Sequence, residues 1–472
     1  MSYFVTEVQP PLAFIEPSFN AAVWQGARSL LPFWLRWRLR IDQVEVHNGD
    51  TLARLYQDFQ SGKARFLIAF RHPSTSDPLC IAQMIWSQLP AIASQQGIRI
   101  TNPHVHFVYD RGIPLWAGRP VGWLMAQLGG TPIRRGGLDR PGLRSIRQLF
   151  AQGDFPMAAA PEGGTNGHNE LISPLEPGIA QFGFWCTEDV RDRDTQVFIL
   201  PLGIQYHFTT APWTSLVQLL SQLEADSGWV PPPAPATLPA IRNGQPLTPE
   251  QETWLYQRLY GLGEHLLVQL ERYYIRFYQH MLPETLADAL ANPSQAGDTS
   301  LDLPQRLQTL LDTALIVAEQ FFQLTPKGTV IDRCRRVEQA GWDRIYRNDL
   351  QLSDLSPVEQ GLADRIAEEA DLRLWHMRLV ENFVSVTGRY VKEKPTVERF
   401  ADTLLLLWKT IARIKGDRTS QIPRLGAQRV QMTVGQPLCV SDRWDDYQGN
   451  RRQAITSLTQ DLQGALDAMI QT

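Results

Sequence analysis

The chain has 472 residues, of which 43% are hydrophobic and 20% are charged. This length and balance predict a globular protein with a large core and more than one domain. The net charge of −4 argues against a nucleic-acid partner, because general binding to nucleic acid needs a basic surface.

The cysteines and the hydropathy of the sequence indicate the cellular compartment of the protein. The four cysteines lie far apart and form no CxxC pair, which predicts reduced thiols in a cytoplasmic protein. No stretch has the long uncharged apolar run of a transmembrane helix, and the N-terminus lacks the basic and apolar regions of a signal peptide. We therefore expect no transmembrane helix and no signal peptide, and a peripheral membrane contact stays open.

Residues 1–60 are expected to form an N-terminal segment with one amphipathic basic helix. Residues 1–20 are rich in proline and predict irregular structure, whereas residues 21–40 combine aromatic residues and leucines with four arginines. One interpretation is a helix in a membrane surface with its basic groups near lipid phosphates. The other is a helix packed on the protein, which the interruption by Pro32 favours. The membrane interpretation rests on Trp24, Phe33, Trp34, Trp37, Arg28, Arg36, Arg38 and Arg40.

Residues 61–211 alternate short apolar runs with helical patterns, which predicts an α/β fold with a sheet flanked by helices. Pro201 within the last predicted strand indicates an edge or bulged strand, because proline cannot donate to a ladder. The predicted strands are 66–70, 104–109, 156–160 and 197–204, and the predicted helices are 79–89, 116–128 and one ending at 152.

Residues 212–424 have a different character. After the segment WVPPPAP, which excludes regular structure, five amphipathic patterns carry Leu, Ile and Val at helical spacing. Thr248 and Ser356, each followed by proline and glutamate, are good helix starts. We expect an all-helical block with helices at 248–281, 304–324, 327–347, 356–392 and 396–416.

Residues 425–472 return to a strand pattern and end in a helical one. A strand and a helix after the helical block suggest that the first domain is completed here, so the block is a large insertion. Residues 430–434 should then pair into the same sheet as 66–70 and 197–204. The alternative is an appended domain with its own hairpin.

The segment RHPSTSD places a histidine and an aspartate five positions apart, at His72 and Asp77. On a continuous helix this spacing points the side chains about 140° apart, so they meet only if the chain turns between them. The intervening Pro-Ser-Thr-Ser has the composition of a turn. Asp77 would then hold the ring N–H and leave the other nitrogen as a general base. Asp77 before Pro78 is also a good helix N-cap, and the two roles are compatible.

Two later motifs offer an anion clamp and a carboxylate. In GGTPIRR, Arg134 and Arg135 lie in a glycine-flanked turn, which suits bidentate phosphate binding, although plain surface charges are an equal interpretation. In APEGG, Glu162 precedes Gly163 in a loop of small residues. Its carboxylate would accept hydrogen bonds from a substrate hydroxyl or organise backbone N–H groups.

A metal site at His104 and His106 is the less favoured interpretation. The two lie on one face of a predicted strand with Asp110 nearby, and no other cluster stands at zinc-like spacing. We expect an ordinary strand and no metal.

In this order, the motifs RHPSTSD, GGTPIRR and APEGG and the strand FILPLGI resemble those of the glycerolipid acyltransferase family, of 1-acylglycerol-3-phosphate acyltransferase type. That family carries His-x4-Asp, Gly-x-x-x-Ile-x-Arg, Phe-Pro-Glu-Gly and a strand with proline. The resemblance covers roughly residues 60–207 and 425–472. The matching residues are His72, Ser74, Asp77, Gly129, Ile133, Arg135, Pro161, Glu162, Gly163 and Pro201.

The chain departs from the family pattern at three places. Arg71 replaces the usual Asn before the histidine, and Ala160 replaces the Phe before Pro-Glu-Gly. Thr165 and Asn166 stand where an arginine often follows, which weakens the expectation of a phosphorylated acceptor.

The resemblance implies transfer of a fatty acyl group to a glycerol-phosphate-type acceptor, with acyl-CoA or acyl-carrier protein as the donor substrate and no cofactor. It implies that His72 takes the proton of the acceptor hydroxyl and that Asp77 orients the imidazole. The substrate-binding residues that it implies are Arg135, Arg134, Glu162, Gly163 and Ser74. Two rivals stay open, an acyltransferase for a non-phosphorylated acceptor and a non-catalytic lipid-binding protein of the same fold.

Overall fold

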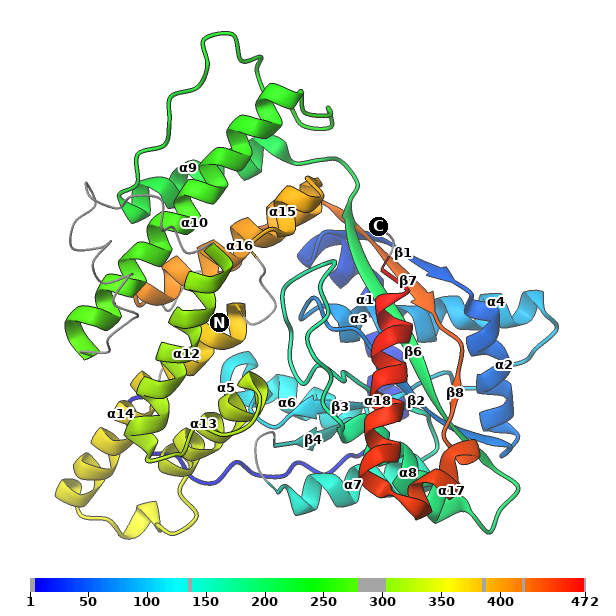
Figure 1. The fold of residues 1–472 in the computed structure, drawn as a ribbon. Coiled ribbons are helices and arrows are strands. Elements are labelled where there is room, and N and C mark those ends of the chain that lie inside the picture. Colours follow the sequence, from blue (N-terminus) through cyan, green and yellow to red (C-terminus); the bar gives the residue numbers. More distant parts are fainter. Residues whose placement is uncertain (1–4, 135–137, 279–302, 384–387, 418–420, 471–472) are drawn as a thin grey trace. The chain divides into compact units, whose positions relative to one another are not determined.

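The computed structural model describes residues 5–134, 138–278, 303–383, 388–417 and 421–470 (Figure 1). The chain divides into two compact units. The sheet unit comprises Ala13–Thr209 and Ala427–Thr472, and the helical unit comprises Met1–Leu12 and Thr210–Gly426. The predicted fold class, an α/β sheet flanked by helices with a large all-helical insertion, is confirmed.

The sheet unit is built on one 8-stranded sheet. In space the strands run β1 (Ile41–His47), β7 (Gln428–Val434), β6 (Gln196–Phe208), β2 (Ala64–Phe70), β5 (Met157–Ala159), β3 (His106–Asp110) and β4 (Thr131–Ile133), and β8 (Leu438–Cys439) also pairs with β6. The strands β7 and β8 run antiparallel to β6, and the other ladders are parallel.

The central strand β2 reads ARFLIAF, and its side chains alternate between two hydrophobic cores. Phe66, Ile68 and Phe70 lie in one core, and Leu67 and Ala69 lie in the other. Because helices cover both faces of the sheet, the strand is apolar throughout.

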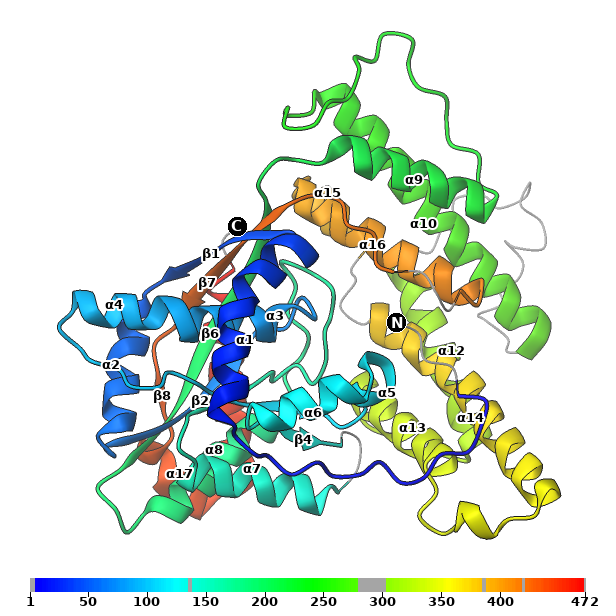
Figure 2. The same ribbon diagram turned by 180° about the vertical axis from the view of Figure 1, so that it is seen from behind.

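Two groups of helices supply these covers. Figure 2 shows α1 in front of the sheet, and the opposite view in Figure 1 shows α18 in front. The first face is covered by α1 (Ala21–Phe33), α2 (Gly49–Gln60), α3 (Asp77–Gln83) and α4 (Leu89–Gln95). The second face is covered by α7 (Arg140–Gln152), α8 (Gly178–Val190), α17 (Trp444–Gly449) and α18 (Arg451–Asp467).

Residues 430–434 pair into the sheet as predicted. Strand β7 forms a ladder with β6 that ends at the pair Phe208 and Gln428. Just beyond it, the Thr209 N–H donates to the Ala427 carbonyl at 3.0 Å. The two ends of the helical block therefore lie side by side at the end of one antiparallel ladder. The block is an insertion between two paired strands, and the alternative of an appended domain is wrong.

The expectation that Pro201 lies in an edge strand is wrong, because β6 is an interior strand between β2 and β7. Its ladder with β7 begins at Leu202, and its ladder with β8 involves Phe198 and Ile199. Pro201 lies in the gap between these ladders, where its carbonyl accepts a hydrogen bond from Gly435 N at 2.9 Å. The nitrogen and carbonyl of one strand residue point to the same side, so the missing N–H also faces this gap and interrupts no ladder.

Two further differences concern element boundaries in the sheet unit. The sequence IDQVEVH of β1 alternates poorly, and β1 was not predicted to be a strand. The predicted helix 116–128 is two helices, α5 (Ile113–Ala117) and α6 (Arg119–Gln127). Gly118 separates them with a φ of +93°, a conformation that glycine adopts without steric cost.

The helical unit contains long amphipathic helices close to four of the predicted ranges. The predicted helix 356–392 is instead two helices, Pro357–Phe383 and Tyr390–Glu393, and the helix Trp213–Ser227 was not predicted. The Thr248 and Ser356 hydroxyls each accept a hydrogen bond from the backbone N–H three residues later, and that residue's side chain accepts one in return from the backbone N–H of Thr248 or Ser356. These reciprocal caps confirm both residues as helix starts. Buried ion pairs join neighbouring helices, as between Arg258 and Glu224. The helices described are α9 (Trp213–Ser227), α10 (Pro249–Tyr278), α12 (Leu303–Phe322), α13 (Val330–Ile345), α14 (Pro357–Phe383), α15 (Tyr390–Glu393) and α16 (Val397–Ile414).

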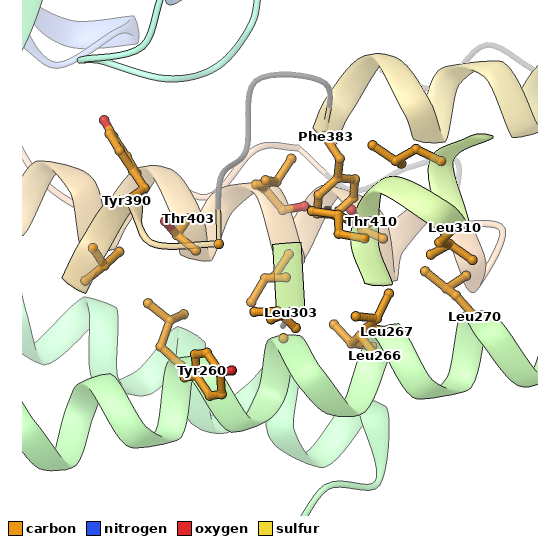
Figure 3. A pocket seen from close by; sticks show the side chains of 18 of the residues that line it. Tyr260, Leu266, Leu267, Leu270, Leu303, Leu310, Phe383, Tyr390, Thr403 and Thr410 are labelled. Carbon is orange, nitrogen blue, oxygen red and sulfur yellow. Dashed lines mark hydrogen bonds between the residues drawn. The ribbon is translucent and has the colours of Figure 1, made fainter. Parts of the chain in front are cut away.

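The helical unit contains an apolar cavity of about 110 Å³. Figure 3 shows side chains that line it. Leu266, Leu267 and Leu270 of α10 face it from one side, and Leu310 of α12 and Thr410 of α16 face it from others. None of the polar motif residues lines this cavity, so it is separate from the catalytic site predicted around His72 and Asp77.

Among the helices of the described residues, none has both the length and the apolar character that crossing a bilayer requires.

Candidate active site

His72 lies in the turn that joins β2 to α3. Its ring Nδ1 is 2.8 Å from Oδ2 of Asp77. A carboxylate oxygen accepts, so Nδ1 carries the ring proton and Nε2 keeps a lone pair. The turn between the two residues therefore brings base and carboxylate together, as the spacing predicted.

Asp77 is fully buried and accepts from three donors. Oδ2 accepts from the Ser74 backbone N–H at 2.9 Å as well as from His72, and Oδ1 accepts from the Tyr206 hydroxyl. Burial holds the pKa of Tyr206 well above its ordinary value, and the carboxylate of Asp77 adds to the shift. The phenol therefore stays protonated and remains a donor. These contacts fix both oxygens of Asp77 and thus the plane of the imidazole.

The N-cap expectation for Asp77 is wrong. Asp77 is the first residue of α3, its N-cap is Ser76, and no side chain caps the helix. The carboxylate turns back toward Ser74 and His72 instead, because the turn offers it the ring N–H of His72 and the backbone N–H of Ser74 at once.

The other ring nitrogen of His72 also has a partner. Thr165 Oγ1 lies 2.9 Å from Nε2. Thr165 belongs to the loop that follows β5, and Asn166 N in the same loop donates to the His72 carbonyl at 3.3 Å. The half-buried His72 side chain, 17% exposed, thus lies between Thr165 and Asp77.

Glu162 organises the two loops around His72. Its Oε1 accepts from the His72 backbone N–H at 2.8 Å, and its Oε2 accepts from Ser173 N at 2.9 Å and from the Asn166 side chain at 2.8 Å. Burial raises the pKa of Glu162, while the backbone donors oppose that rise. These contacts match the alternative in which Glu162 holds backbone N–H groups, and contact with a substrate hydroxyl stays a prediction.

Gly163 follows Glu162 with a φ of +68°, in the left-handed region that favours glycine. A Cβ at this position would also collide with the carboxylate of Glu176. The positive φ of this turn therefore favours glycine, and another side chain would also have to displace Glu176.

Arg71 has a structural role that its position beside His72 did not reveal. Its guanidinium is fully buried and donates to four main-chain carbonyls. Three belong to the loop after Glu162 and one belongs to β6: His168, Asn169, Leu171 and Ile204. The side chain of Asn169 also exchanges hydrogen bonds with the backbone of Tyr206 in β6. Arg71 therefore clamps the loop to the sheet.

The remaining predicted residues follow the ends of neighbouring strands. Arg134 comes directly after β4, and its backbone N–H donates to Asp139 at 2.7 Å. Arg135 lies outside the described residues. Ser74 lies in the turn, where its Oγ accepts from Ser76 N at 3.2 Å. Because β2, β5, β3 and β4 are parallel, the residues that follow them gather at one edge of the sheet.

His104 and His106 are structural. Ring nitrogens of His104 and His106 contact the carbonyls of Leu128 and Gly129 at 2.7 and 2.8 Å. Burial lowers the pKa of His104 to about 4, so its ring stays neutral. No group of three or more metal-ligating side chains occurs among the residues that the structure describes.

The sequence did not predict the contact of Tyr206 with Asp77 or the contact of Thr165 with His72. Tyr206 lies two residues beyond the predicted end of its strand, on the same face as Leu202 and Ile204. Continuing the alternation would have placed it there. Thr165 was noted only as a departure from the family pattern, and no local signal pairs it with His72.

The clamp by Arg71 predicts a stability effect. Arg71→Met leaves four buried carbonyls without their charged donor and should lower the free energy of unfolding of the sheet unit by about 3 kcal/mol or more. The matched control is Arg191→Met, because the Arg191 guanidinium lies over the Trp444 ring at the surface, where a change of about 0.5 kcal/mol is expected. Equilibrium denaturation measures both, and equal losses would contradict the clamp.

A comparison with protein families agrees with the geometry. The family model described as Acyltransferase matches residues 43–205, which run from β1 to β6 and include the loops of His72, Arg134 and Glu162. No curated protein matches this chain. Residues 43–205 of the sheet unit therefore form an acyltransferase domain.

Proposed function

We propose that this acyltransferase moves a fatty acyl group from an acyl thioester to the hydroxyl of a glycerol-phosphate-type acceptor, in phospholipid biosynthesis. The acceptor would be glycerol-3-phosphate or 1-acylglycerol-3-phosphate, and the donor acyl-CoA or acyl-carrier protein. The observation that carries the proposal is the imidazole of His72, whose Nδ1 is held by a buried carboxylate while Nε2 faces a hydroxyl.

The chemistry follows from this tautomer. A hydroxyl that attacks a thioester must lose its proton, and Nε2 of His72 is the acceptor for it. The imidazolium that forms is stabilised by Asp77, whose carboxylate is 2.8 Å away. The same proton then passes to the sulfur of the leaving thiol. No cofactor enters these steps.

The acceptor's phosphate would bind at the edge of the sheet where the parallel strands end. Arg134 follows β4 at this edge, and Arg135 is the next residue in the sequence. Their guanidinium groups are the phosphate ligands that we propose, because guanidinium pairs with phosphate in a bidentate way. Gly163 and Glu162 would shape the same edge, with Glu162 acting through the loops it holds. Thr165 stands where the family often has an arginine. The lack of that arginine leaves a non-phosphorylated acceptor as the rival proposal.

His72→Ala should lower acyl transfer by about 100-fold or more, because the general base is lost. The control is His47→Ala, since His47 is exposed at the end of β1, and it should transfer at the parental rate. Release of thiol from acyl-CoA with glycerol-3-phosphate, followed by detection of the lipid product, measures both. Near-parental turnover by a folded His72→Ala protein would refute the assignment of the base.

The phosphate contact has a separate test. Arg135→Ala should raise the KM for glycerol-3-phosphate by about 10-fold or more, with little change in the KM for the acyl donor, because it removes a charge-assisted contact to one substrate. Arg193→Ala, at an exposed position before β6, is the control. If glycerol serves as well as glycerol-3-phosphate, the acceptor is not phosphorylated.

The N-terminal helix α1 and the π-helical segment that continues it, Trp34–Arg38, support peripheral binding to an anionic membrane surface. Its predicted lipid-facing residues divide in the structure. Trp24 is 5% exposed and packs in the core of the sheet unit, so its assignment to the membrane is wrong. Trp37 is 82% exposed, and Phe33, Trp34 and Leu30 are exposed with it, next to Arg36 and Arg38. An apolar surface beside cationic groups is the pattern of interfacial binding.

Neutralising Arg36, Arg38 and Arg40 to Gln should weaken binding to vesicles that contain anionic lipid, because each basic residue near such a surface contributes about 1 kcal/mol. Phe33→Ser with Trp37→Ser should weaken it too, through the lost apolar contact. Co-sedimentation measures both, with vesicles of neutral lipid as the control. Unchanged binding by both variants would show that this helix does not contact the bilayer.

A further inference from the structure

The apolar cavity of the helical unit is long and narrow. It is lined by residues of α10, α12, α14 and α16, and its lining on α10 runs from Tyr256 to Leu270. At about 1.5 Å per residue, this stretch of helix is about 21 Å long. A volume of about 110 Å³ along such a length has a narrow cross-section, which suits one extended chain better than a compact ring.

Three of the hydroxyl groups that line the cavity are occupied by partners within the protein. The Thr403 and Thr410 hydroxyls donate to carbonyls one turn earlier in α16, at 3.0 and 2.9 Å (Figure 3). The Tyr390 hydroxyl donates to the Asp402 carboxylate at 3.1 Å. None of the described residues that line the cavity carries a charge. The wall therefore offers mainly hydrocarbon, and a cavity with such a wall takes up apolar ligands.

Gly263 lies in the middle of the side of α10 that faces the cavity. Leu259, Leu266 and Leu270 flank it at helical spacing, and all four residues line the cavity. A Cβ at Gly263 would meet no atom of the described residues within 4 Å. The space in front of this glycine is therefore open, and a larger side chain at this position would extend into the cavity.

The two glycines in the middle of α10 differ in what explains them. Glycine inside a helix lowers stability relative to alanine. At Gly261 close packing accounts for it, because a Cβ there would collide with the Trp229 ring. Gly263 has no such neighbour among the described residues, and its effect is to leave the cavity open. Protein interiors hold few voids larger than a water molecule. A void that is kept open at a cost in stability is what a binding site requires.

We propose that this cavity binds the unbranched alkyl chain of a fatty acyl compound. The length and narrowness of the cavity select an extended chain, and its uncharged wall selects hydrocarbon. Burial of methylene groups supplies the affinity, and the chain provides the contacts that the void lacks. The choice of a fatty acyl compound rests on the proposed function, whereas the apolar site itself does not. The acyl donor and a free fatty acid share this chain and are the two sources to be distinguished.

The first test is photolabelling of the full chain without an acceptor, so that no turnover is needed. The probe is palmitate with a photoreactive diazirine near the end of its chain, and mass spectrometry identifies the labelled peptides. The labels should lie on α10, α12 or α16, and excess palmitate should prevent them. If palmitoyl-CoA prevents them too, the site takes the chain of the acyl donor. If palmitate alone does so, the site takes a free fatty acid. Labels confined to the sheet unit, or no labels, would overturn the proposal.

The second test fills the cavity. Gly263→Leu should lower the affinity for palmitate by about 10-fold or more, because the new side chain takes the place of the ligand. Gly263→Ala makes the same change from glycine with a single added carbon and should lose much less affinity. Gly361→Leu is the matched control, since Gly361 is exposed in α14 and a Cβ there would meet no atom of the described residues within 4 Å. Equilibrium dialysis measures all three, and parental affinity in Gly263→Leu would contradict the proposal.

The folding of the variant and the proposed function are checked separately. Filling a void and replacing a helix glycine both stabilise a protein, so Gly263→Leu should raise the thermal midpoint without ligand. The labels are read on the parent protein and do not depend on the folding of any variant. If palmitate labels the cavity but no acyl group reaches glycerol-3-phosphate, the site stands and the proposed function is wrong. If transfer occurs and the labels avoid the helical unit, the proposed function stands and the site is wrong.

Discussion

The arrangement around His72 depends on one buried cation. The Arg71 guanidinium lies inside the sheet unit and would be costly there without partners, since transferring a charge from water to a protein interior is strongly unfavourable. Main-chain carbonyls of the loop and of β6 accept hydrogen bonds from its two terminal nitrogens. The neighbouring carboxylate of Glu162 holds the backbone N–H groups of His72 and Ser173. The turn after β2 and the loop after β5 therefore behave as one hydrogen-bonded body.

This hydrogen-bonded body positions the partners of both ring nitrogens of His72. On one side Asp77 is fixed by Ser74 and Tyr206, and on the other side Thr165 is fixed through its neighbour Asn166. Both oxygens of Asp77 are engaged, so its carboxylate cannot turn without breaking hydrogen bonds. A site with this rigidity is preorganised, which lowers the cost of reaching a reactive geometry. The same rigidity makes the loop sensitive to any change at Arg71.

The sequence predicted the local parts of this structure well and the long-range parts poorly. His72, Asp77 and the turn between them form a local unit, so spacing and turn composition sufficed. Tyr206 and Thr165 lie 129 and 93 positions from their partners, and nothing in a short window indicates such a pair. Pro201 was expected in an edge or bulged strand because the rule for proline is local, whereas the gap between the ladders of β7 and β8 is set by the whole sheet. Trp24 and Trp37 look alike in the sequence, and only packing separates the buried ring from the exposed one.

The position of β7 has a consequence for how the chain is made. Strand β1 forms its ladder with β7, and Glu45 of β1 and Arg429 of β7 are 384 positions apart. At about 5–20 residues per second, a ribosome needs roughly 20–80 s between the emergence of these two strands. Throughout that interval β1 lacks its partner strand, and from the emergence of β6 (Gln196–Phe208) onward the edge of β6 that pairs with β7 is also unpaired while the insertion is synthesised. Unpaired edges invite association with other chains, so the nascent protein spends most of its synthesis in the state most exposed to aggregation or to capture by a chaperone.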